Sequence, residues 1–485
     1  MTAGVTFGES WCGLSAAATV ELGRRRPGVV AVLRVAGVQD TWWEVLPEQA
    51  RQLPAELARI DAFLDDERFI APWRAVFAQR LGRPSVPVET LLRMLYLKHR
   101  YQLGYETLCR EVADSLSWRR FCRIPLTSPV PHPTTLIKLM RRSGAQAVEQ
   151  LNAALLGKLA EDKLLRCRKL RIDTTVIEAD IDHPTDADLL AHGVRKLGRL
   201  VRRIKAAGAA KRTCFRDRSR SAGRRLKDIS RTLRRRTGQA LGEIDRLTGE
   251  VAAVARATLR DVAAVERNAR RTLGKRPSGR LTHLVGELAQ TVAGTQRLLE
   301  QTAQRLAGNR TIPGRLVSLA DPDARPIRKG KPQHPTQFGY TALVAEDERG
   351  FVVDHRVQRG NPPDAPQLVP SVERATTLTG RPPGTVVADR GFGTAANDWA
   401  LTDLGVARIG LQRAGKPGKA RREYERSRPF RRMRNWRVGV EARISHLKRS
   451  FGFRRTRLRR LNGAQTWAGL GVFAYNLHRM TVTCR

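Results

Sequence analysis

Acidic residues are scarce in this 485-residue chain, in which 46 Asp and Glu stand against 89 Lys and Arg. The formal net charge of +43 is extreme for a protein of 54.2 kDa. A surface of this kind attracts polyanions and raises the rate at which it meets them. The charge therefore favours nucleic acid as the partner, ahead of an anionic membrane.

Long apolar runs and paired cysteines are also missing. No run of about 18 apolar residues occurs, so a membrane span is not predicted. Glu9 precedes any sizeable apolar stretch, so a secretory signal is not expected. The six cysteines are scattered without CxxC spacing, which indicates neither a zinc site nor a disulfide framework. We expect a cytoplasmic protein with reduced thiols and no membrane association.

The length suggests roughly three structural units, and 41% hydrophobic residues are enough to build their cores. Residues 1–50 look irregular and carry no motif. Residues 51–165 show apolar positions at helical spacing, with helices expected after Leu53, after Pro87, over Tyr105–Phe121 and after a cap at Thr134–Thr135. Short basic helices joined by tight turns favour a helix-turn-helix-like DNA-binding domain. The alternative is a plain helical bundle with a basic surface.

A long basic segment follows. Residues 189–310 read as helical, with cations crowded into the first half and apolar residues at three-four spacing in the second half. This pattern predicts an antiparallel helical hairpin that breaks near Pro277-Ser278-Gly279. Its cations suit phosphate binding or a solvated face equally well. Asp186, just before it, and Asp364, after Gly360, are interpreted as helix caps.

Residues 166–188 and 311–485 form the third unit. Strands are expected around Asp173, over Phe338–Val344, over Phe351–Val357, before Asp389 and over Ala407–Leu411, with helices between the later strands. Residues 414–435 look basic and loop-like, and a helix from about Trp436 to Phe451 follows. The fold class is therefore α/β (α+β), a ribonuclease H-like mixed sheet interrupted by the helical insertion and preceded by an all-α domain.

Three carboxylates stand out in this unit. Asp173 lies on a strand, Asp389 ends the strand Thr385-Val386-Val387-Ala388, and Glu441 lies on a helix. Phosphodiester cleavage needs an activated oxygen nucleophile and a stabilised leaving oxygen, and two divalent ions serve both. Clustered carboxylates repel each other without a cation. A converging Asp-Asp-Glu set therefore indicates a cradle for Mg²⁺ or Mn²⁺, which prefer oxygen ligands.

Cations accompany these carboxylates. Arg437 is one helical turn before Glu441, and Lys448 is two turns after it, on the same face. Taken alone, this stripe is an ordinary surface ion-pair pattern. Together with Asp173 and Asp389, it indicates a metal ligand flanked by DNA-phosphate contacts. Arg390 and Arg443 are further candidates for DNA contact.

These motifs together resemble the DDE transposases of bacterial insertion sequences, in the insertion-sequence-5-like group. The resemblance covers residues from about 55 to the end. It rests on blocks that include Asp173-Thr174-Thr175-Val176, His183-Pro184-Thr185-Asp186, Asp321 to Arg325 with Lys329-Gly330-Lys331, Asp389-Arg390-Gly391-Phe392, and Arg437, Glu441 and Lys448 in the Y-(2)-R-(3)-E-(6)-K signature. The tyrosine position of that signature is Arg434 here, which departs from the family pattern.

The resemblance implies an enzyme that nicks the ends of a mobile element and joins the freed 3′-hydroxyl to target DNA. Asp173, Asp389 and Glu441 would be catalytic and hold Mg²⁺ or Mn²⁺, and Arg437 and Lys448 would grip phosphates. The partners would be double-stranded terminal inverted repeats and target DNA, with a homodimer on DNA in the bacterial nucleoid. Two other functions stay open: a domesticated metal-dependent nuclease and a non-enzymatic architectural DNA-binding protein.

Overall fold

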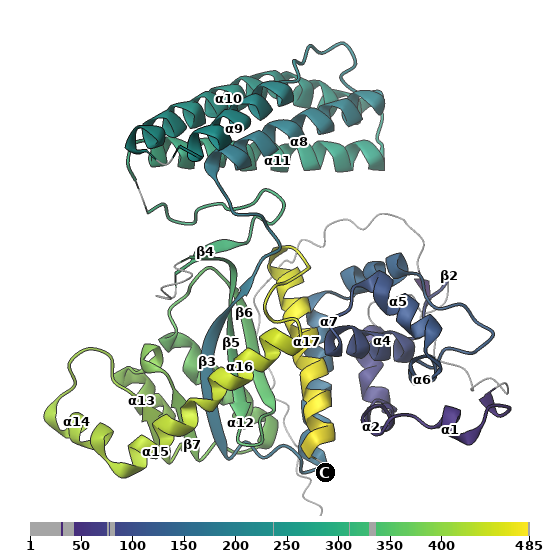
Figure 1. The fold of residues 1–485 in the computed structure, drawn as a ribbon, viewed down its shortest axis with the longest axis vertical. Helices are drawn as coiled ribbons and strands as arrows, with labels where there is room; N and C mark the ends of the chain where they lie inside the picture. The colour runs from purple at the N-terminus through teal and green to yellow at the C-terminus, as the bar shows by residue number, and fades with distance from the viewer. Residues whose placement is uncertain are drawn as a thin grey trace, which may run out of the picture.

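The computed structural model describes residues 31–32, 43–74, 77, 83–235, 237–309, 311–328 and 336–483. Most of the segment 1–50 and the predicted block Lys329-Gly330-Lys331 lie outside these residues. Figure 1 shows a group of N-terminal helices beside a sheet, and a bundle of long helices standing apart from both. None of the helices in the described part of the chain is both long and apolar enough to cross a membrane.

The centre of the molecule is a mixed six-stranded sheet. Strands β4, β5, β3, β7 and β8 follow one another in that order, and β6 also pairs with β5. The contacts of β5 are antiparallel, whereas β3, β7 and β8 run parallel. The bounds are β3 Lys169–Glu178, β4 Arg325–Ile327, β5 Gln337–Asp347, β6 Val352–Arg359, β7 Thr385–Ala388 and β8 Arg408–Leu411, with a separate parallel pair, β1 Ala31–Val32 and β2 Arg83–Pro84. The predicted mixed α/β class is confirmed.

Helices of the second half of the chain surround this sheet. They are η3 Ala365–Gln367, α12 Leu368–Thr379, η4 Arg390–Phe392, α13 Ala395–Asp403, α14 Lys419–Arg426, α15 Arg428–Arg437, α16 Gly439–Ser450 and α17 Arg460–Thr483. The loop-like prediction for residues 414–435 is wrong. Ser427 caps α15 by accepting a hydrogen bond from the Phe430 amide, and Phe430 and Met433 are buried against Val387 of the sheet. Two buried side chains in a very basic sequence are enough to fix this helix.

The N-terminal unit is helical, as predicted. Its elements are α1 Glu48–Arg51, α2 Ala55–Phe63, η2 Glu67–Phe69, α3 Ala71–Arg74, α4 Val88–Arg100, α5 Tyr105–Asp114, α6 Leu116–Phe121 and α7 Pro133–Glu161. The single helix expected over Tyr105–Phe121 is broken at Ser115, whose hydroxyl accepts from the Trp118 amide and starts α6. The cap of α7 is His132, not Thr134–Thr135. Almost every residue of α4 is buried, so a DNA contact from this unit must come from other helices.

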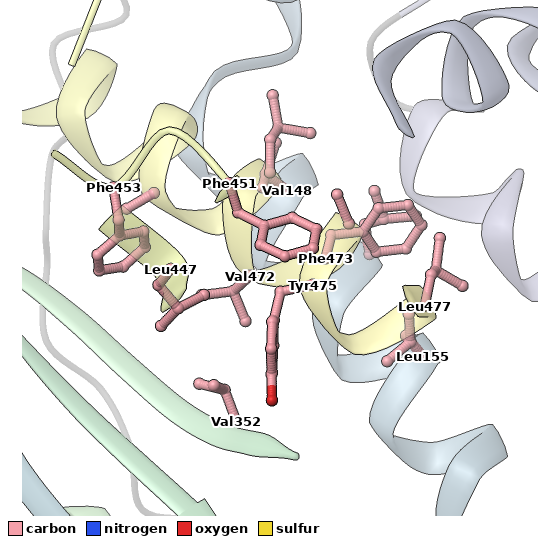
Figure 2. Packing of buried hydrophobic residues seen from close by; sticks show 14 of the residues in the cluster. Val148, Leu155, Val352, Leu447, Phe451, Phe453, Val472, Phe473, Tyr475 and Leu477 are labelled. Carbon is pink, nitrogen blue, oxygen red and sulfur yellow. The ribbon is translucent and has the colours of Figure 1, made fainter. Parts of the chain in front are cut away.

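Helix α17 joins the N-terminal unit to the sheet. It is buried along most of its length and packs on α7, α4, α2 and β6. Figure 2 shows Leu477 of α17 beside Leu155 of α7, and Tyr475 of α17 directed toward Val352 of β6, all within one hydrophobic cluster. One hydrophobic cluster therefore runs from Leu57 in α2 to the sheet, and the N-terminal helices are fixed on the sheet that carries the predicted carboxylates.

The insertion is a bundle of four helices, not the expected hairpin. Its helices are α8 Asp186–Ala206, α9 Ser219–Leu233, α10 Gly238–Lys275 and α11 Gly279–Leu306. The predicted break near Pro277-Ser278-Gly279 is confirmed between α10 and α11. The basic first half of the insertion was expected to form one arm of that hairpin. It folds back on itself instead, because Ala222 and Ile229 of α9 are buried against apolar residues of α8 and α10. The bundle thus has cores of its own.

A buried carboxylate ties the base of this bundle together. Thr185, and not Asp186, caps α8 by accepting from the Asp188 amide at 3.1 Å. Asp186 is 3% exposed and pairs with Arg305 at 2.8 Å and Arg315 at 2.9 Å. The side-chain amide of Gln301 donates to it at 3.1 Å. Asp186 therefore joins α8, α11 and the segment that returns to the sheet.

Candidate active site

The first two predicted carboxylates lie on neighbouring parallel strands. Strands β3 and β7 pair in a register that sets Ile172 opposite Ala388. Asp173 and Asp389 directly follow Ile172 and Ala388 in the sequence, and the backbone of Asp389 is still extended, with φ −74° and ψ 179°. Adjacent strands are about 4.8 Å apart, and side chains alternate between faces. Because Ile172 and Ala388 are buried on one face, Asp173 and Asp389 project together from the other.

The third carboxylate is linked to the first through an arginine. The Arg437 guanidinium lies 3.8 Å from Oδ2 of Asp173 and 3.2 Å from Oε1 of Glu441. Asp173 is largely buried, with 15% of its side chain exposed, whereas Glu441 is 59% exposed. Arg437 is the last residue of α15 and Glu441 is in the first turn of α16, so the predicted one-turn spacing holds across the junction between the two helices. One cation thus bridges two of the three carboxylates.

The Asp389 loop brings a fourth carboxylate to the site. The Gly391 amide donates to Oδ1 of Asp389 at 2.8 Å, which fixes the start of η4. A β-carbon on Gly391 would lie 3.1 Å from that oxygen and 3.1 Å from Oδ2 of Asp364. Asp364 is at the N-cap position of η3, as the sequence indicates, but its side chain accepts no capping hydrogen bond there. Asn397 holds the two loops together by donating to the carbonyls of Ala365 and Phe392. No spacing in the sequence indicates that Asp364 lies beside Gly391.

Helix α16 is anchored to the sheet by a buried ion triad. Glu346 of β5 is fully buried. Its carboxylate accepts a hydrogen bond from Nε of Arg171 in β3 and another from Nε of Arg443 in α16, the latter at 2.7 Å. Burial disfavours the Arg443 charge, but Tyr475 and Glu346 outweigh it and raise the pKa of Arg443 above its ordinary value. Arg171 also donates to the Trp436 carbonyl at 2.9 Å. The triad therefore fixes both sides of the α15–α16 junction, where Arg437 and Glu441 lie.

The predicted DNA-contacting cations take different positions. Arg443 is directed into the triad, with 17% of its side chain exposed, so the structure gives it an anchoring contact instead of an open one. Arg390 is exposed beside Asp389 and donates to the Gly415 carbonyl at 3.1 Å. Lys448 is half-buried on α16, two turns after Glu441. Arg437 thus contacts two of the carboxylates and Arg390 adjoins Asp389, whereas Lys448 lies further along α16 and Arg443 supports the helix.

The ligand set fits a hard divalent cation in its chemistry. The candidate ligands are carboxylate oxygens, which Mg²⁺ and Mn²⁺ prefer. In the described part of the chain, however, no three His, Cys, Asp or Glu side chains are close enough together to hold one ion. Instead, the Arg437 guanidinium supplies the positive charge between Asp173 and Glu441. A single ion held by all three carboxylates therefore requires them to come closer together than they are here.

The close approach of Gly439 to Arg171 gives a prediction. A β-carbon at Gly439 would lie 1.9 Å from Nη1 of Arg171, whose guanidinium is already hydrogen-bonded to Glu346 and to Trp436. We expect Gly439→Ala to destabilise the protein by about 1–3 kcal/mol, as overpacking does. Denaturant unfolding measures this. Gly418→Ala, at a position where a β-carbon would meet no neighbour within 4 Å, is the control and should leave stability nearly unchanged.

Two family models match segments of this chain. Residues 46–142 match the family described as "Transposase domain (DUF772)", and residues 308–477 match the "Transposase DDE domain". The chain is also similar to a protein of Rhizobium meliloti named "Uncharacterized protein ORF8 in nfe locus". The two are 27% identical over 177 residues, which cover 32% of this chain and 83% of that protein. No solved structure matches.

The mixed sheet, with Asp173 on β3 and Asp389 at the end of the neighbouring β7, is a ribonuclease H-like catalytic fold, as predicted. The chain belongs to the DDE transposases of insertion sequences and is an enzyme of DNA transposition. Enzymes of this family generally use divalent metal ions and act on DNA. Asp389 and Glu441 lie inside the matched DDE segment. Asp173 lies before it, separated by the four-helix insertion, so its link to the site comes from the strand register. The insertion-sequence-5-like group stays a prediction.

Proposed function

We propose that Asp173, Asp389 and Glu441 are the catalytic carboxylates with which this transposase cleaves element ends and joins them to target DNA. The observation that carries the proposal is the register of β3 and β7, which sets Asp173 beside Asp389, with Arg437 linking Asp173 to Glu441. Divalent ions bound to these carboxylates would activate the attacking oxygen and stabilise the leaving oxygen. Mg²⁺ is the ion proposed, with Mn²⁺ as a substitute.

The chain's own cations have two tasks in this proposal. Arg437 neutralises Asp173 and Glu441 when no metal ion is present, because carboxylates this near to one another are stabilised by a shared cation. With DNA bound, Arg437, Lys448 and Arg390 would contact phosphates beside the cleaved bond, and such contacts hold the backbone in register without reading sequence. The N-terminal helices other than α4 are proposed to bind the terminal inverted repeats. Bringing two ends together implies a homodimer on DNA.

The test is cleavage and joining by the wild-type protein. The substrate is a duplex that carries the sequence flanking the gene, incubated with Mg²⁺, with Mn²⁺ or with EDTA. We expect nicks at a repeat boundary and joined products with either metal ion and none with EDTA. DNA binding without cleavage under all conditions would indicate an architectural protein, and cleavage without boundary preference or joining would indicate a nuclease. Either outcome contradicts the proposal.

A further inference from the structure

The four-helix insertion carries much of the positive charge of the chain. Residues 186–306 contain 29 Lys and Arg against 11 Asp and Glu, a net charge of +18 out of the total of +43. Some exposed arginines of the bundle are paired with acidic residues, such as Arg246 with Glu243 and Arg270 with Glu266. Exposed cations are also grouped along α9.

The cations of α9 form one exposed stripe. Arg220, Arg224, Lys227, Arg231 and Arg234 follow one another at intervals of four, three, four and three residues, which places them on the same side of a helix. All five are exposed, and the opposite side of α9 buries Ala222 and Ile229 in the bundle. At 1.5 Å per residue the stripe is roughly 21 Å long. This is about the length of six base pairs of B-DNA at 3.4 Å each.

Little negative charge offsets this stripe. In the described part of the chain, the only ion pair within it joins Arg231 to Asp228 at 3.5 Å, and both side chains are exposed. Arg225, on the inner side of the stripe, is instead neutralised by Glu250 at 2.9 Å. Like charges one helical turn apart destabilise a helix. If these residues served only solubility, the helix would be more stable with acidic residues between them, as in α10, where Arg246 pairs with Glu243 and Glu250.

A hollow lies next to the stripe. It has a volume of about 530 Å³ between α10 and the start of α9, and arginines dominate its polar lining. Arg220 and Arg224 of the stripe border it, together with Arg216 before the helix. Two acids, Asp217 and Glu250, are also part of the lining. The hollow gives the cationic face a concave edge in which the convex backbone of a duplex fits better than on a flat surface.

We propose that the exposed stripe of α9 and the adjoining hollow bind the phosphate backbone of duplex DNA, as a second contact region separate from the carboxylates. The inference rests on the proposed function, because it assumes that this chain handles DNA. The contact is independent of base sequence, since arginine and lysine on phosphates position a duplex without reading it. The bundle stands apart from the sheet (Figure 1), so this surface holds DNA at a distance from the cleaved bond.

The experiment measures binding of the full-length protein to a 30-base-pair duplex of arbitrary sequence by fluorescence anisotropy over a range of salt concentrations. The variant carries Arg220→Gln, Arg224→Gln and Lys227→Gln. If each residue meets one phosphate, the slope of log K against log salt should become less negative by about 3, and the affinity at 0.15 M salt should fall on the order of 10²-fold. All three side chains are exposed, so folding should be unchanged, as circular dichroism checks.

The matched control removes the same charge from paired arginines. It carries Arg203→Gln, Arg246→Gln and Arg270→Gln, whose side chains are 56%, 59% and 59% exposed and lie beside Glu287, Glu243 and Glu266. We expect this control to bind with nearly the wild-type slope. A second variant, Arg220→Lys with Arg224→Lys, keeps the charge and should keep the affinity.

Three outcomes decide between the inference and the function on which it rests. If the wild-type protein binds no duplex, the proposed function itself fails. If the wild-type protein binds and the α9 variant matches the control in slope and affinity, the inference alone is wrong. If the α9 variant binds DNA normally but loses binding to vesicles containing phosphatidylserine, the stripe serves a membrane surface, and the inference is also wrong.

Discussion

Replacing Asp389 with asparagine is expected to lower metal-dependent cleavage at the element boundary by at least about 10³-fold, with DNA binding unchanged. A carboxylate that holds catalytic ions contributes several kcal/mol to the transition state, and each 1.36 kcal/mol is a factor of ten in rate. Asparagine keeps an oxygen that accepts from the Gly391 amide, so the turn into η4 is preserved. Single-turnover cleavage measures the rate, and anisotropy measures binding.

The control for this variant is Asp403→Asn. Asp403 lies exposed at the end of α13 in the same domain, and its replacement by asparagine removes the same charge as Asp389→Asn does. Its cleavage rate should stay close to that of the wild type. If Asp389→Asn cleaves within tenfold of the wild type, Asp389 is not a metal ligand, and the assignment that follows from the β3–β7 register is wrong. If Asp389→Asn loses DNA binding as well, the change acts on the fold and not on the chemistry.

The catalytic sheet was largely predictable because its signals are local. Strands β5, β6, β7 and β8 and the helices between them appear near their predicted positions, since short β-rich runs are bounded by glycine, proline and acidic turns. Asp173 and Asp389 were predicted from their places on such strands. Their side-by-side arrangement, however, depends on the pairing of β3 with β7, which are more than two hundred residues apart in the chain.

The charged residues whose positions differ from the predictions share one physical cause, because charged side chains acquire their partners only in the folded protein. Asp186 was interpreted as a cap but pairs with Arg305 in the last turn of α11 and with Arg315 in the segment after it. Arg443 was interpreted as a DNA contact but meets buried Glu346. Asp364 approaches Asp389 across two loops. Local sequence patterns indicate helix caps and surface stripes, and they carry no information about contacts between residues tens to more than a hundred positions apart.

The second large effect is expected from Glu346→Gln. This change keeps the size of the side chain but leaves Arg171 and Arg443 without the charge that balances them in a buried place. Removing one partner of a buried ion pair costs about 3–5 kcal/mol, more than removing an exposed one. Denaturant unfolding should show this loss. Glu149→Gln, which breaks the exposed pair with Arg356, is the control and should change stability by less than about 1 kcal/mol.

The same variant tests whether the triad positions catalytic groups or only stabilises the fold. Arg443 and Arg171 hold the α15–α16 junction, and Glu441 lies in the first turn of α16. Cleavage by Glu346→Gln, measured well below its unfolding transition, should therefore fall, while duplex binding by the N-terminal helices and the bundle persists. Cleavage at the wild-type rate would show that buried Val440, Ile444 and Leu447 are enough to seat α16. In that case the triad contributes stability alone, and the position of Glu441 depends on hydrophobic packing.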